Sequence, residues 1–113
     1  MNSHSDAFTN RLAPYRDVPG MLAALLISRD GLVIAADAEP DFDAEAFAAQ
    51  AGGVIQSSLR LAMELGESAA KYIAVEFEQA TMVLAPFNNE LTLALVGRPQ
   101  TLRCHYSIST AVI

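Results

Sequence analysis

The chain has 113 residues, of which 52% are hydrophobic and 18% charged, and its formal net charge is −6 at pH 7. This length predicts one domain over residues 1–113, and the apolar content supplies a core, which excludes a disordered chain. The negative charge argues against nucleic acid and anionic lipid as partners, because both require positive surfaces.

Targeting signals and disulfides are missing from the sequence. The longest uninterrupted apolar run, 21–27, is far shorter than the roughly 20 residues of a membrane-spanning helix. The first residues lack the basic and apolar regions of a signal peptide. Cys104 is the only cysteine, which rules out an intrachain disulfide. We therefore expect a cytoplasmic protein without membrane insertion.

A short helix and a hairpin open the chain. Phe8, Leu12 and Tyr15 recur at helical spacing and predict a helix over 6–15, preceded by a frayed segment over 1–5. Residues 21–27 are all apolar, as expected of a strand covered on both faces. The Arg-Asp-Gly sequence at 29–31 predicts a tight turn into a second strand, since glycine accepts the positive φ that such a turn requires.

The longest predicted element is a helix over 44–65, which follows an acidic loop. Asp41 or Asp43 can cap it, and Gly66 is its stop signal. Its apolar side chains form two adjacent stripes that together span about 200°, roughly twice the stripe that a surface helix buries. One stripe holds Phe47, Val54, Leu61 and Leu65, and the other holds Ala48, Gly52, Ile55, Leu59 and Met63. The second stripe therefore needs its own cover, either a second copy of the chain or the domain's own terminal helices.

Two glycines, Gly52 and Gly53, lie inside this helix, where each costs about 1 kcal/mol relative to alanine. Two explanations are open. The helix either approaches the sheet or a partner helix closely at this point, or it is kinked.

Three strands are predicted next, over 71–77, 81–85 and 91–96. The first alternates, with Ile73, Val75 and Phe77 on one side, which is typical of an edge or half-covered strand. The last is uniformly apolar and predicts a buried strand. The tail, 99–113, fits the periodicity of both helix and strand. The fold class is therefore α/β (α+β), in the order helix, two strands, long helix, three strands, tail.

Catalytic chemistry finds little support in the sequence. Cys104 and His105 are neighbours, and adjacent side chains of a strand point apart, so they make a poor catalytic pair. No phosphate-binding loop is present, and histidine and cysteine lack metal-ligand spacing. The acidic cluster at Asp37, Glu39, Asp41 and Asp43 is interpreted as a solvated capping loop, with a site for a cation or a basic partner as the alternative. We expect no catalytic residue, metal or cofactor, and hence no enzyme.

These features together resemble the roadblock/dynein light chain family over residues 8–97. The resemblance is carried by Val18-Pro19-Gly20, by Ser28-Arg29-Asp30-Gly31-Leu32, by the alanine-rich helix ending at Leu65-Gly66 and by the three strands that follow. It implies a five-stranded antiparallel sheet with the long helix on one face and the terminal helix or helices on the other. The short tail departs from family members that have a long final helix.

The resemblance also implies that two copies pair through their third strands and long helices. The predicted dimer interface comprises Ala48, Gly52, Ile55, Leu59, Met63, Tyr72, Ala74 and Glu76. Bacterial members of this kind resemble gliding-motility regulators that act on a small Ras-like GTPase. The implied function is a non-catalytic homodimeric regulator or scaffold that binds such a GTPase and stimulates its GTP hydrolysis. The alternatives are a structural adaptor without effect on nucleotide turnover and a small-ligand sensor.

The predicted partner-binding surface is a polar arc on the long helix, formed by Gln56, Arg60 and Glu64. Arg60 also suggests an arginine finger supplied to the GTPase. Its place on a helix flank favours an ion pair with Glu64 at i+4 instead.

Overall fold

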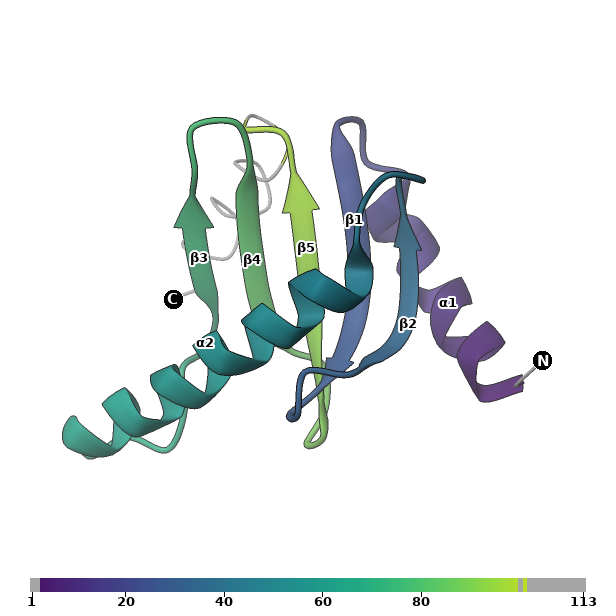
Figure 1. Ribbon diagram of the computed structural model, residues 1–113. Coiled ribbons are helices and arrows are strands. Elements are labelled where there is room, and N and C mark those ends of the chain that lie inside the picture. Colours follow the sequence, from purple (N-terminus) through teal and green to yellow (C-terminus); the bar gives the residue numbers. More distant parts are fainter. Residues whose placement is uncertain (1–2, 100, 102–113) are drawn as a thin grey trace.

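A five-stranded antiparallel sheet lies between two helices in the computed structural model, which describes residues 3–99 and 101 (Figure 1). The elements in chain order are α1 (Ser3–Arg16), β1 (Met21–Ser28), β2 (Val33–Ala38), α2 (Ala44–Glu64), β3 (Ile73–Glu76), β4 (Thr81–Pro86) and β5 (Leu91–Gly97). The strand order is β2-β1-β5-β4-β3, which places β2 and β3 at the two edges of the sheet. The predicted fold class is confirmed.

The two helices build one apolar core on each face of the sheet. Leu25, Ile27 and Leu84 point toward α2, where Ala48 and Ala51 cover them. On the opposite face Leu12 of α1 packs with a second set of strand residues that includes Ala24, Leu26 and Leu95. Strand β1 contributes to both cores and pairs with both β2 and β5. Its continuous apolar sequence is therefore explained by burial on both faces.

The predicted β1–β2 turn and the predicted start and stop signals of α2 are confirmed. Gly31 has φ +82° in the β1–β2 turn, as a tight hairpin requires. Asp43 is the N-cap of α2, and its Oδ1 accepts a hydrogen bond from the Ala46 amide at 3.1 Å. Gly66 has φ +73° just after the helix ends, which confirms it as the stop signal.

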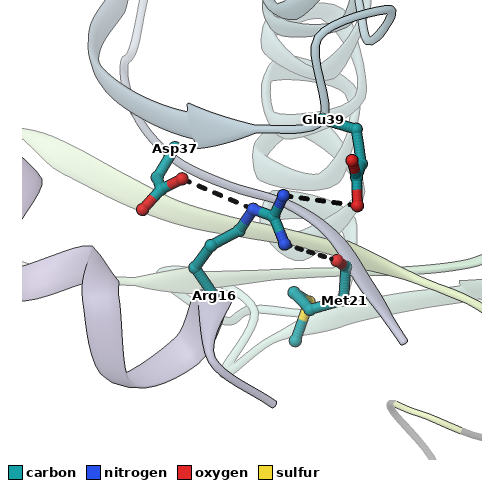
Figure 2. Close-up of polar contacts among 4 residues, drawn as sticks. All are labelled: Arg16, Met21, Asp37 and Glu39. Atoms are coloured by element: carbon teal, nitrogen blue, oxygen red, sulfur yellow. Dashed lines mark hydrogen bonds and ion pairs between the residues drawn. The ribbon is translucent and has the colours of Figure 1, made fainter. Parts of the chain in front are cut away.

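Helix α1 ends at a charged cluster that the sequence analysis did not predict (Figure 2). The Arg16 guanidinium donates from Nη1 to the Met21 carbonyl at 2.9 Å. Its Nε lies 3.4 Å from Asp37 Oδ1, and its Nη2 lies 3.3 Å from Glu39 Oε1. Asp37 and Glu39 are thus ion-paired rather than simply solvated. These contacts anchor the last turn of α1, which extends one residue beyond the predicted 6–15 at this end.

The orientation of α2 corrects the interpretation of its second apolar stripe. Ala48 is fully buried, Gly52 is also buried, and Ile55 packs against the α2-side core. The first half of this stripe therefore faces the chain's own sheet. A Cβ added at Gly52 would lie 2.9 Å from the Cα of Gly31, so the glycine allows the helix to touch the β1–β2 turn. Of the two explanations for the glycines, close approach holds at Gly52.

Strand β3 is shorter than the predicted 71–77, because only four residues pair with β4. Phe77 follows the strand and remains 58% exposed. Beyond β5 the structure describes Pro99 and Thr101, whose hydroxyl donates to the Pro19 carbonyl at 3.1 Å. The choice between helix and strand for the tail, together with Cys104 and His105, lies outside the described residues.

Candidate functional site: an interaction surface

The edge of the sheet at β3, which no other strand among the described residues joins, is the first component of a candidate interaction surface. The Phe77 amide donates to the Ala80 carbonyl at 2.7 Å across the β3–β4 turn. Hydrogen-bonded and non-bonded pairs alternate along an antiparallel ladder, so Ile73 and Val75 direct their backbone groups toward β4. The backbone groups of Ala74 and Glu76 therefore face the open edge. Both belong to the predicted interface, whereas Tyr72 directly precedes the strand.

The second component is the apolar end of α2, by which we mean Leu61 and Met63 near the helix C-terminus and Leu65 at the C-cap, together with Val54 at the middle of the helix. Their exposed fractions are 63%, 74%, 72% and 38%, in that order. Figure 1 shows that the C-terminal half of α2 extends past the β3 edge of the sheet. Leu61 and Leu65 are four residues apart and share one side of the helix, and neighbouring exposed apolar side chains are a mark of an interaction surface.

The residues predicted for the dimer interface divide into two groups. Ala48 and Gly52 are buried within the chain and have almost no surface to offer a second copy. Leu59 is half-buried, and Met63 is exposed. Most of the exposed apolar end belongs instead to the stripe that was expected to face the sheet. Pairing itself stays a prediction. If it occurs, it would use the exposed side of α2 and not the side that the chain's own sheet covers.

The predicted polar arc is accessible, but its internal contacts differ from expectation. Gln56, Arg60 and Glu64 are all exposed. The Gln56 side chain donates from Nε2 to the Arg29 carbonyl at 3.3 Å, which links α2 to the β1–β2 turn. Arg60 donates to the Ser57 hydroxyl at 3.2 Å rather than pairing with Glu64. An arginine that precedes a glutamate by four residues is in the weaker order for a helical ion pair, which accounts for this choice.

A pocket was missed by sequence reasoning. It has a volume of about 390 Å³ and lies between the C-terminal half of α2, the connection from α2 to β3 and the β4–β5 turn. Ile55 and Leu59, both predicted to contact a second copy, line it. The one sequence signal for this pocket is the run of small residues Ser68, Ala69 and Ala70, whose side chains fill little of the space beside the helix.

Metal binding and membrane insertion find no support within the described residues. No three side chains of His, Cys, Asp or Glu among residues 3–99 and 101 lie close enough together to hold a metal ion. In the same part of the chain, neither helix combines the length and the apolar character that crossing a bilayer requires.

The sequence profile of the Roadblock/LC7 domain matches residues 9–97, from α1 to the end of β5. The chain belongs to the Roadblock/LC7 domain family. Among curated proteins, no sequence matches this family member significantly.

Solved structures of other proteins share the Roadblock/LC7 fold. An MglB in a tetrameric arrangement superimposes with a TM-score of 0.82 at 18% identity, over 96% of this chain and 82% of that chain. The gliding protein MglB of Thermus thermophilus gives 0.79 at 19% identity, over 95% and 85%. A Roadblock/LC7 domain from Streptomyces avermitilis gives 0.67 at 20% identity, over 88% and 79%. At these identities the likeness establishes a common fold.

Proposed function

We propose that this protein is a non-catalytic regulator that acts in the cytoplasm as a homodimer and binds a small Ras-like GTPase. The observation that carries the proposal is the apolar end of α2 beside the unpaired edge of β3, in a Roadblock/LC7 domain whose fold resembles MglB. Such a combination buries apolar area and pairs backbone groups when a second copy joins it.

In the proposed dimer, the Ala74 and Glu76 backbones of the two copies pair across a two-fold axis. Each β3 edge then becomes an interior pair of a longer sheet. The C-terminal half of α2 extends past its own sheet and would reach over the sheet of the partner (Figure 1). The same surface patch serves both copies, as a two-fold interface requires.

The GTPase would bind the polar arc formed by Gln56, Arg60 and Glu64. All three side chains are exposed, and they border the apolar end that pairing would cover, since Arg60 precedes Leu61 and Glu64 lies between Met63 and Leu65. Chemistry would remain with the GTPase, and the regulator would stimulate hydrolysis by holding the switch segments of the GTPase in their productive arrangement.

A pull-down with a Ras-like GTPase of the same organism, loaded with GDP or with a non-hydrolysable GTP analogue, tests this function. We expect binding in one nucleotide state. The double charge reversal Arg60→Glu/Glu64→Arg should weaken this binding at least about tenfold, because each substituted side chain would then face a group of its own charge on the GTPase. The matched control is Arg98→Glu/Glu78→Arg, which reverses exposed charges elsewhere.

Absence of binding in both nucleotide states would contradict the GTPase proposal and favour the structural adaptor. Equal losses for both double variants would remove the polar arc from the interface. Binding or turnover of GTP by the protein alone would contradict the non-catalytic role.

A further inference from the structure

The pocket beneath α2 is a separate structural feature from the proposed pairing surface. Its lining excludes Leu61, Met63 and Leu65, the most exposed members of the apolar end, and it excludes the whole polar arc. Its volume of about 390 Å³ lies within the range of about 300–1,000 Å³ that small-molecule sites occupy. Ile55, Leu59 and Tyr72 belong both to this lining and to the dimer interface predicted from the sequence, so ligand binding to the paired protein is part of the test below.

The walls of the pocket are apolar on opposite sides. Ile55 and Leu59 of α2 form one wall, and Ile73, Leu84 and Leu91 of three different strands contribute to the other. These strands bring their side chains together because β3, β4 and β5 are neighbours in the sheet. An unbranched apolar chain between helix and sheet would contact both walls, and its apolar surface would be removed from water there.

The lining of the pocket includes a single cationic side chain. Arg29 lines it from the β1–β2 turn and donates from Nη2 to the Asn89 carbonyl of the β4–β5 turn at 2.9 Å. Its position is thus fixed by a contact that uses one of the five guanidinium N–H donors. Glu90 is the single anion of the lining, and the chain as a whole carries a charge of −6. These negative charges disfavour a multiply charged ligand and leave one carboxylate as the match for one guanidinium.

We propose that this pocket binds a medium-chain aliphatic carboxylate, with its chain between α2 and the sheet and its carboxylate on Arg29. The ligand would bridge α2, the sheet, the β1–β2 turn and the β4–β5 turn. It would stabilise the folded chain, because it binds the assembled pocket and not the unfolded polypeptide.

Calorimetric titration of the protein with decanoate, below the concentration at which decanoate forms micelles, tests the proposal. Decanol serves as the uncharged ligand of equal chain length. We expect saturable binding of one decanoate per chain, and Arg29→Met should weaken it about tenfold, as the loss of a charge-assisted hydrogen bond predicts. The same variant should leave decanol binding unchanged. Arg98→Met, which removes an exposed arginine outside this pocket, should alter neither titration.

A second variant, Ser58→Phe, places a bulky side chain in the lining and should abolish binding of both ligands. Circular dichroism shows whether this variant is folded, and the Arg29→Met arm does not depend on it. Absence of saturable decanoate binding, including absence because a second copy covers the pocket, would overturn the proposal. So would equal effects of Arg29→Met and Arg98→Met. The titration uses no GTPase, so its failure would leave the proposed function untouched.

Discussion

The lack of a side chain at one position allows α2 to contact the β1–β2 turn. Gly52 and Gly53 are neighbours with opposite surroundings. A Cβ at Gly52 would meet the Gly31 backbone, whereas a Cβ at Gly53 would have no atom within 4 Å. A backbone neighbour cannot move aside as a flexible side chain can. The two positions therefore allow helix propensity to be separated from packing within one element.

Gly52→Ala should lower the free energy of unfolding by about 1–2 kcal/mol, because overpacking outweighs the roughly 1 kcal/mol of helix propensity that alanine gains. Gly53→Ala should raise it by about 0.5–1 kcal/mol, since only the propensity changes there. Urea denaturation of both variants at one protein concentration measures the difference. If both substitutions change stability in the same direction, the close contact between α2 and the β1–β2 turn is not energetically significant.

At the scale of elements, β3 is an edge strand, and its two sides have different neighbours. Its inner side forms a ladder with β4 through Ile73 and Val75, and the backbones of Ala74 and Glu76 face the edge that no other described strand joins. Proline removes a backbone donor, so its effect depends on which side of the strand the substituted residue serves.

Ala74→Pro should abolish pairing of two copies and leave the monomer folded, because the lost donor faces the open edge. Val75→Pro should instead destabilise the fold by about 3 kcal/mol or more, since it removes a donor from the β3–β4 ladder. Light scattering reports the pairing, and circular dichroism reports the fold. Unfolding of the Ala74 variant, or a folded dimer in both cases, would show that the edge is not used as proposed.

For the whole molecule, the distribution of exposed apolar side chains is uneven. Leu32 and Leu61 are equally exposed, at 63%, but Leu32 lies at the β1–β2 turn while Leu61 belongs to the apolar end of α2. Isolated exposed leucines are common in soluble proteins, and clustered ones are not. The two leucines therefore give a matched test of the proposed interface.

The native protein should scatter light as a particle of twice 12.1 kDa at micromolar concentration. Leu61→Asp should shift the equilibrium to monomer by at least about tenfold, because the carboxylate would be desolvated in the interface. Leu32→Asp should leave the mass unchanged. A native monomer would refute pairing altogether, and equal responses of the two variants would place the interface elsewhere.

The sequence was sufficient for the architecture because its strongest signals are local. The uniform apolar character of β1, the cap at Asp43 and the positive φ at Gly31 each depend on adjacent residues. The orientation of α2 was not predictable in this way, because periodicity gives the width of an apolar sector and not its direction. The Arg16 cluster and the pocket depend on residues far apart in the chain, whose proximity only the fold creates.

The two edges of the sheet differ, and the difference limits what can grow from them. Asp37 of β2 is ion-paired with Arg16 of α1, and charged side chains on an edge strand discourage another strand from joining. Strand β3 has no comparable cluster among its described contacts. Sheets with two receptive edges can add copies at both ends and elongate into filaments. With one receptive edge, strand addition stops at two copies, so concentrating this protein should saturate a dimer rather than extend a fibre.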